Sequence, residues 1–175
     1  MEDDPGRFNV LEFRGATVIV DDCHNASALT ALTAALAQFP AELRTIVYSA
    51  GDRRMDRDII RQGELLAASF DRVILYEDAS AVGRARGELA RLFRQGFAGC
   101  PREIVVDEIG DHGQAIEWAL DQAGPGELIV IQTEDEGIEP TLEIIRNITT
   151  PAAHEDTECP EQPHERAPVA RSHQL

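Results

Sequence analysis

The chain has 175 residues, enough for one domain with a substantial core and too few for two comfortable ones. Its formal net charge of −16 argues against a nucleic-acid or anionic-membrane partner. No apolar run approaches the roughly 20 residues that span a bilayer, and the acidic start of the chain lacks the features of a signal peptide. The three cysteines follow no disulfide or metal spacing, so we expect a reduced, cytoplasmic protein.

Arginine supplies all 16 basic residues, because the sequence holds no lysine. A P-loop needs a lysine to reach the terminal phosphates of a nucleotide, and Schiff-base chemistry needs a lysine nucleophile. No Gly-x-Gly-x-x-Gly follows any predicted strand either, which argues against an independent nicotinamide-dependent enzyme. The sequence therefore excludes a P-loop and a lysine nucleophile in this chain, and it disfavours an independent nicotinamide-dependent enzyme.

Apolar runs alternate with helical stripes along the chain. Segments 8–13 and 16–21 predict a hairpin, and the next elements are helices over 26–39, 55–70, 85–97, 111–123 and 137–146, with strands over 45–48, 72–76, 103–106 and 128–132. Continuous apolar strands between amphipathic helices are typical of a mostly parallel sheet covered on both faces. We predict an α/β fold, a Rossmann-like three-layer sandwich whose mostly parallel sheet has about six strands and one antiparallel edge strand, Phe8–Phe13. Residues 1–149 would form this domain, and the apolar-poor residues 150–175 a disordered tail.

Polar clusters follow each of the predicted parallel strands. The carboxyl ends of parallel strands lie on one edge of the sheet, where open α/β sheets bind ligands. The clusters are Asp21–Asn25, 51–54, 77–78 with 83–88, Asp107-Glu108 and 133–136, and they bring Arg53, Arg54, Arg84 and Arg86 to this edge. Guanidinium groups suit carboxylates and phosphates. Singly, such residues can be helix N-caps, as Asp56, Ser80 and Asp111 can, or surface ion pairs; their convergence on one edge favours a ligand site.

The pair Cys23-His24 invites a nucleophile, but adjacent residues on an extended segment point to opposite faces, so His24 is poorly placed to activate Cys23. Asp22 and His24 share a face, yet one such pair is an incomplete metal site. We therefore assign no metal site and no catalytic residue. His24 and Asn25 suit hydrogen bonds to a neutral heterocycle or a ribose.

These residues carry a family resemblance. The stretch Val20-Asp21-Asp22-Cys23-His24-Asn25-Ala26 resembles the Asp-Tyr-Ala-His-Asn-Pro motif that opens the C-terminal domain of Mur-type ligases. The blocks Gly51-Asp52-Arg53-Arg54 and Glu77-Asp78 … Gly83-Arg84-Ala85-Arg86-Gly87-Glu88 resemble the corresponding segments of the cyanophycin synthetases. The resemblance covers roughly residues 6–147.

The resemblance implies a lid domain of an ATP-dependent acid–amino acid ligase, which closes over a nucleotide held by the P-loop of a central domain. In that family ATP phosphorylates a carboxylate and an amino group attacks the acyl phosphate. Carried over by position, Asp21, His24, Asn25, Asp52 and Arg53 would face ATP. Arg54, Arg84, Arg86 and Glu88 would face the substrates, arginine or another amino acid and a peptide carboxylate. Mg²⁺ would be supplied through the partner domain.

The sequence also departs from the family pattern. Asp22 stands in place of a tyrosine, Cys23 of a small residue and Ala26 of a proline, and the P-loop and ATP-grasp parts of cyanophycin synthetase are absent. One hypothesis is therefore a lid that works with a separate, P-loop-containing partner. The other is a stand-alone nucleotide or amino-acid binding module, or a non-catalytic remnant of such a ligase.

Overall fold

A computed structural model describes residues 8–51, 54–77, 84–134 and 137–149 of the chain. Its strands are β1 (Asn9–Phe13), β2 (Ala16–Asp21), β3 (Leu43–Tyr48), β4 (Arg72–Tyr76), β5 (Val105–Ile109) and β6 (Glu127–Gln132). Its helices are α1 (Ala26–Leu36), α2 (Asp56–Ser69), α3 (Glu88–Phe97), α4 (His112–Asp121) and α5 (Ile138–Thr149). The predicted order of elements is confirmed. The tail predicted over 150–175 lies outside the described residues.

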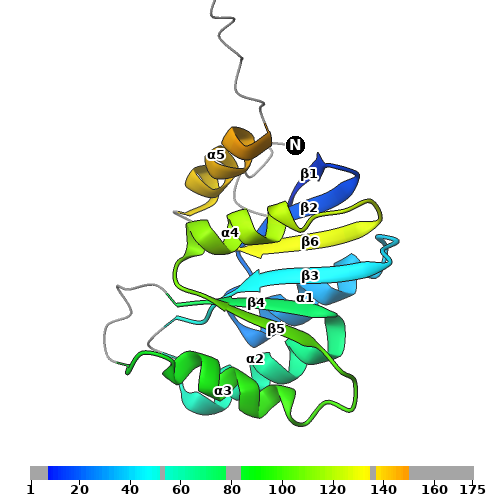
Figure 1. The fold of residues 1–175 in the computed structure, drawn as a ribbon. Coiled ribbons are helices and arrows are strands. Elements are labelled where there is room, and N and C mark those ends of the chain that lie inside the picture. Colours follow the sequence, from blue (N-terminus) through cyan, green and yellow to red (C-terminus); the bar gives the residue numbers. More distant parts are fainter. Residues whose placement is uncertain (1–7, 52–53, 78–83, 135–136, 150–175) are drawn as a thin grey trace, which may run out of the picture.

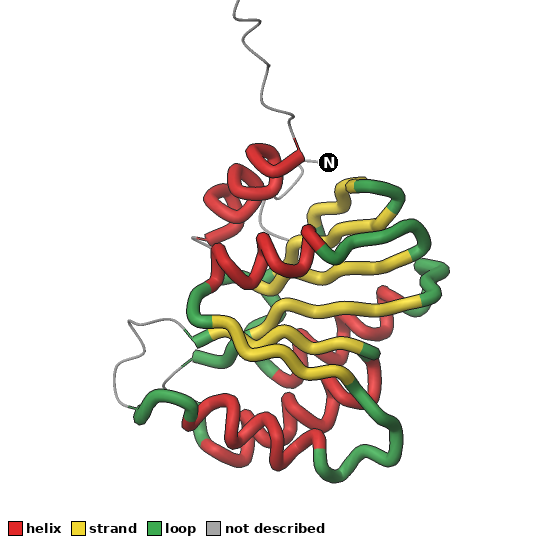
Figure 2. The backbone as a smooth tube through the Cα atoms, viewed as in Figure 1, coloured by secondary structure: helices red, strands yellow, loops and turns green. Residues whose placement is uncertain are grey.

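One sheet holds all six strands in the order β1-β2-β6-β3-β4-β5. Strand β1 pairs with β2 antiparallel, and the other neighbours pair parallel. Helices α1, α2 and α3 cover one face and α4 and α5 the other, as Figure 1 and Figure 2 show. The predicted three-layer sandwich, with its antiparallel edge strand, is confirmed.

Each face of the sheet has its own apolar core, because successive strand residues point to opposite faces. In β3, Ile46 and Tyr48 pack beneath α1, α2 and α3, whereas Val47 packs beneath α4 and α5. Such strands are buried on both faces, which explains why their sequences read as continuous apolar runs. None of the described helices is long and apolar enough to cross a membrane.

The prediction for the fifth strand was wrong at both ends. We expected a strand over 103–106 followed by Asp107 and Glu108, but β5 runs from Val105 to Ile109 and contains both carboxylates. As the edge strand of the sheet, β5 keeps one side open to solvent and tolerates charge there. Arg72 on β4 also neutralises Asp107 across the strands, at 2.8 Å from its Nε to the carboxylate.

Helices α2 and α3 pack with their backbones in contact. Gly63 and Gly96 face each other at this contact, and a Cβ placed on Gly96 would lie 2.2 Å from the carbonyl oxygen of Ile60. A Cβ on Gly63 would lie 2.7 Å from the carbonyl oxygen of Phe93. Both distances are too short for carbon, so only glycine permits this approach.

Candidate functional site

The carboxyl ends of β2, β6, β3 and β4 are joined by hydrogen bonds at what we call the carboxyl edge, formed by residues 21–25, 49–51, 54, 76–77, 84–88, 110–112 and 132–134. The carbonyl oxygen of Asp21 accepts from the amide of Thr133 at 3.2 Å. Oε1 of Gln132 accepts from the amide of Ser49 at 3.1 Å and lies 3.4 Å from the hydroxyl of Tyr76. Our sequence reasoning missed Gln132. The sequence feature that could have indicated it is the position of this polar residue directly after the apolar run Leu128–Ile131.

Asp21, predicted to face ATP, is placed at this edge. Its Oδ2 accepts from the amide of Phe8 at 2.9 Å, a bond that connects the segment before β1 to the end of β2. This contact gives Asp21 a structural role, and its predicted role toward a nucleotide stays a prediction.

Asp22 and His24 form a hydrogen-bonded pair between Asp22 Oδ1 and His24 Nδ1. The carboxylate is nearly buried, with 4% of its side chain exposed, whereas 39% of the His24 side chain is exposed. The pair confirms that the two side chains share a face, as their spacing in an extended segment predicts. The charge of Asp22 is therefore turned toward the imidazole, and the ring lies at the surface of the edge.

Asn25 is the N-cap of α1. Its backbone is extended, and its Oδ1 accepts from the amide of Ala28 at 2.9 Å, which satisfies one of the free amides of the first turn. A cap uses only the oxygen of the side chain, so the amide NH₂ group of Asn25 keeps both of its donors for another partner.

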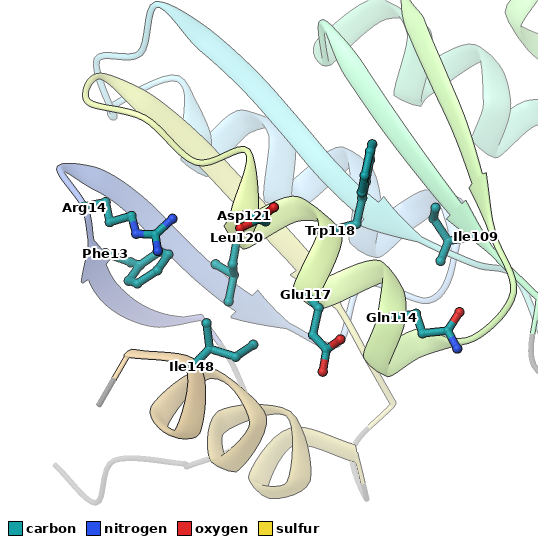
Figure 3. A pocket seen from close by; sticks show the side chains of 9 residues that line it. All are labelled: Phe13, Arg14, Ile109, Gln114, Glu117, Trp118, Leu120, Asp121 and Ile148. Atoms are coloured by element: carbon teal, nitrogen blue, oxygen red, sulfur yellow. The ribbon is translucent and has the colours of Figure 1, made fainter. Parts of the chain in front are cut away.

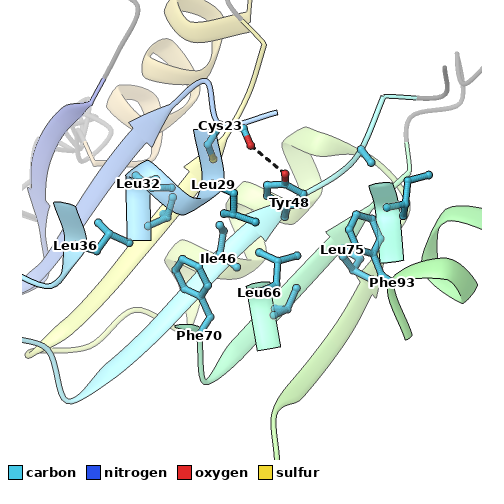
Figure 4. Packing of buried hydrophobic residues seen from close by; sticks show 14 of the residues in the cluster. Cys23, Leu29, Leu32, Leu36, Ile46, Tyr48, Leu66, Phe70, Leu75 and Phe93 are labelled. Carbon is cyan, nitrogen blue, oxygen red and sulfur yellow. Dashed lines mark hydrogen bonds between the residues drawn. The ribbon is translucent and has the colours of Figure 1, made fainter. Parts of the chain in front are cut away.

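Cys23 points away from the edge into the core beneath α1 and α2 (Figure 4). Burial, followed by the neighbouring charge of Asp21, raises the pKa of the Cys23 thiol. The hydroxyl of Tyr48 donates to the carbonyl oxygen of Cys23 at 2.9 Å and lies 2.8 Å from the side-chain amide of Gln62. A buried, protonated thiol is no nucleophile at neutral pH, which agrees with the choice made from the sequence.

Arg84 connects the amino ends of α2 and α3. Its Nη1 lies 2.8 Å from Asp56 and 2.7 Å from Glu88, and its Nη2 donates to the carbonyl oxygen of Arg54 at 2.5 Å. Hydrogen bonding to Asp56 raises the pKa of Arg84, and only 11% of the side chain is exposed. Glu88 also accepts from the amide of Ala85 at 3.0 Å. Arg84 and Glu88 were predicted to bind substrate; the contacts seen here are structural.

Arg54 and Arg86 differ from Arg84. Neither guanidinium group forms an ion pair with another residue in the described ranges 8–51, 54–77, 84–134 and 137–149. Both therefore remain suited to an anionic ligand. Asp52 and Arg53, predicted to face ATP, lie outside the described residues.

A cleft of about 240 Å³ opens between the carboxyl ends of β4 and β5. We call it the β4–β5 cleft; its lining includes Tyr76, Glu77, Arg86, Gly87 and Glu108 over an apolar floor of Leu75, Leu89, Ala90 and Phe93. Strand β4 leads into α3 on one face of the sheet and β5 leads into α4 on the other, and such divergent connections create a ligand crevice.

Gly87, at the amino end of α3, forms part of the wall of this cleft. This residue has φ of 80° and caps α3, a backbone conformation that favours glycine. Its amide donates to Glu77 at 2.7 Å, so the carboxylate occupies the amino end of the helix. Arg86, directly before Gly87, is thereby presented to the cleft.

A larger cavity of about 470 Å³ lies beside α4 and is shown in Figure 3. Phe13, Leu120 and Ile148 form an apolar part of its lining, and Arg14, Glu117 and Asp121 add charge. None of the residues predicted for the site lines this cavity. The site predicted from the sequence and this cavity beside α4 are therefore different places.

Comparison with known proteins reveals a family. The sequence profile of the family described as "Mur ligase, glutamate ligase domain" matches residues 6–133. The chain is 35% identical over 130 residues to the cyanophycin synthetase of Crocosphaera subtropica, which is 74% of this chain and 15% of that protein. The chain therefore spans about a seventh of the length of this curated relative.

Solved structures share the fold. A UDP-N-acetylmuramoyl-L-alanyl-D-glutamate–2,6-diaminopimelate ligase superposes with a TM-score of 0.65 at 21% identity, over 86% of this chain and 33% of that one. E. coli FolC in complex with ADP superposes with a TM-score of 0.61 at 19% identity, over 82% of this chain and 32% of that one. Because the family profile covers most of the sequence and the fold agrees with it, this chain belongs to the Mur ligase family and is its C-terminal, glutamate ligase domain.

Proposed function

We propose that this chain is the lid domain of an ATP-dependent acid–amino acid ligase that resembles the arginine-adding half of cyanophycin synthetase, and that it works with a separate partner holding the P-loop. One observation carries the proposal. Groups suited to a nucleotide, His24 and Asn25, lie on the same edge as the guanidinium groups of Arg54 and Arg86, which suit carboxylates. The relatives that share this domain are ligases.

The nucleotide is assigned to the His24 end of the edge. The exposed imidazole and the amide donors of Asn25 can bind polar atoms of a base or a ribose, as ring nitrogens and amides do. When bound, ATP would supply the phosphoryl group that activates a substrate carboxylate. Mg²⁺ would be supplied through the partner that holds the P-loop, as the family resemblance implies.

The amino-acid substrate, arginine or another, is assigned to the β4–β5 cleft. Its volume of about 240 Å³ suits a small molecule. Arg86 would pair with the carboxylate of the substrate, because a guanidinium group binds carboxylates in a bidentate manner. Arg84 and Glu88 would keep the cleft wall in place through their contacts with α2, and Arg54 would face the peptide carboxylate.

The need for a partner follows from the absence of lysine in all 175 residues. A P-loop uses a lysine to reach the phosphates of ATP. This chain can therefore bind and orient ligands, whereas a second polypeptide or domain must hold the phosphates while the carboxylate is activated.

A domain exchange tests the proposal. In the C. subtropica cyanophycin synthetase, this chain replaces the 130 residues that match it. The ATP-dependent incorporation of amino acid by the chimaera is then measured. We expect activity that His24→Ala and Arg86→Ala each lower about tenfold or more, since each removes a ligand contact worth one charge-assisted or buried hydrogen bond. Arg61→Ala, which removes an exposed ion pair with Glu64 on α2, serves as the control.

Calorimetry on the purified chain separates the two hypotheses. Binding of ADP or arginine without activity in the chimaera would favour the stand-alone binding module. A folded chain that binds neither ligand and restores no activity would be a remnant and would refute the proposal. Asn25→Ser is the informative variant at the cap, because serine keeps the N-cap and loses only the amide donors.

A further inference from the structure

Asp22 departs from the family pattern, and its contact with His24 gives the departure a chemical consequence. Oδ1 of Asp22 contacts Nδ1 of the imidazole. An ionised carboxylate can only accept, so Nδ1 must carry a proton. In a neutral imidazole the other nitrogen then has none, because the partner of one ring nitrogen decides the state of the other.

We propose that Asp22 is a positioning residue that holds neutral His24 in its Nδ1-protonated tautomer, so that Nε2 acts as a hydrogen-bond acceptor toward a donor group of the bound nucleotide. The donor is a hydroxyl of the sugar or the exocyclic amine of the base. The identity of the ligand rests on the proposed function, whereas the tautomer does not.

The backbone around the pair fixes its geometry. The carbonyl oxygen of Asp21 accepts from the amide of Thr133, directly after β6, and the carbonyl oxygen of Cys23 accepts from the hydroxyl of Tyr48. Helix α1 begins after the cap at Asn25. Cys23 is fully buried between them. The segment is thus held on both sides of Asp22 and His24, and the two side chains are kept together on the outer side.

The outer nitrogen is placed where a ligand can reach it. The His24 side chain is 39% exposed, and within the part of the chain that the structure describes no residue bonds to its Nε2. The amide group of Asn25, at the start of α1, belongs to the same carboxyl edge.

Nitrogen-15 NMR of the full chain tests the tautomer at a pH where the ring is neutral. We expect His24 to show a protonated Nδ1 and an unprotonated Nε2. In Asp22→Asn the amide can donate to Nδ1, so the proton should move to Nε2, as happens when asparagine replaces the aspartate of a catalytic triad. Asp22→Glu should restore the original pattern. His112, on α4, is the internal control in every spectrum.

A His24 ring protonated at Nε2 in the unmodified chain would overturn the inference, and so would an unchanged tautomer in a folded Asp22→Asn variant. If Asp22→Asn does not fold, the spectra of the unmodified chain and of Asp22→Glu test the tautomer: a proton on Nε2 of His24 in either protein would overturn the inference.

Calorimetry with ADP, 2′-deoxy-ADP and inosine diphosphate tests the ligand contact. We expect Asp22→Asn to weaken ADP binding about tenfold. One of the two analogues lacks the hydroxyl or amine that donates to Nε2. That analogue should bind the unmodified chain about as weakly as ADP binds Asp22→Asn, and its affinity should not fall further in the variant. Equal ADP affinity of the two proteins would overturn the contact. Absence of all nucleotide binding, with the tautomer as expected, would refute the proposed function and leave the positioning role in place.

Discussion

Replacing Arg84 by methionine should destabilise the fold, because this side chain is a structural connection between two helices. Methionine keeps an apolar stem of similar length and removes only the guanidinium group. The variant loses the contacts to Asp56, Glu88 and the carbonyl oxygen of Arg54, at 2.8, 2.7 and 2.5 Å.

The size of the effect follows from the exposure of each partner. Asp56 is 61% exposed, so its contact is screened and adds well under about 1 kcal/mol. Glu88 is 28% exposed and the Arg84 side chain 11%, so their charge-assisted bond and the bond to the Arg54 carbonyl contribute more. We expect a loss of about 2–3 kcal/mol in the free energy of unfolding. For a chain of this size the melting temperature should then fall by about 4–12 °C.

Urea unfolding followed by circular dichroism measures the loss. Arg86→Met is the matched control, since Arg86 is exposed, lines the cleft and has no ion pair among the described residues. It should change stability by about 0.5 kcal/mol or less. An Arg84→Met variant with the stability of the unmodified chain and a weakened amino-acid affinity would refute our reasoning and favour the substrate role expected from the sequence.

Two further predictions concern packing and pH. Gly96→Ala should cost about 2–4 kcal/mol in urea unfolding, because its Cβ would lie 2.2 Å from the Ile60 carbonyl oxygen and overpacking outweighs the gain in helix propensity. Gly113→Ala, on α4 with its nearest atom at 3.4 Å, should stabilise by about 0.5–1 kcal/mol; equal effects would contradict the close helix contact. Burial raises the pKa of the Cys23 thiol in the fold, so stability should fall as pH rises above the unfolded thiol pKa of about 8.5. From pH 9 to 10 the unmodified chain should lose about 1.2 kcal/mol more than Cys23→Ala, and parallel pH curves would show that the thiol ionises equally in both states.

The fold could be predicted from the sequence wherever burial on both faces dictated the residue type. Residues 46–48 of β3 and 128–131 of β6 are continuously apolar because helices cover both sides of the sheet. Strand β5 was misplaced because an edge strand tolerates Asp107 and Glu108, and acidic residues usually indicate the end of a strand.

The placement of the candidate residues on one edge of the sheet could be predicted, and their contacts only partly. Alternation along an extended segment brought Asp22 and His24 to one face, and local capping preferences account for Asn25 and Asp111. The partners of Arg84 lie up to 30 residues away, and spacing within a segment carries no information about such contacts. Gln132 was missed for the same reason, because its partners are Ser49, directly after β3, and Tyr76 in β4.

The contact between α2 and α3 has a mechanical consequence. Arg84 connects the amino ends of the two helices through Asp56 and Glu88. A second contact, at Gly63 and Gly96, lies about eight residues or roughly 12 Å further along. Contacts at two positions along the helices restrict both sliding and bending between them. We therefore expect α2 and α3 to move as one rigid body. The amides of both helices should therefore exchange with solvent deuterium in one cooperative opening. Because Nη2 of Arg84 donates to the carbonyl oxygen of Arg54, a ligand that displaces Arg86 should displace Arg54 as well.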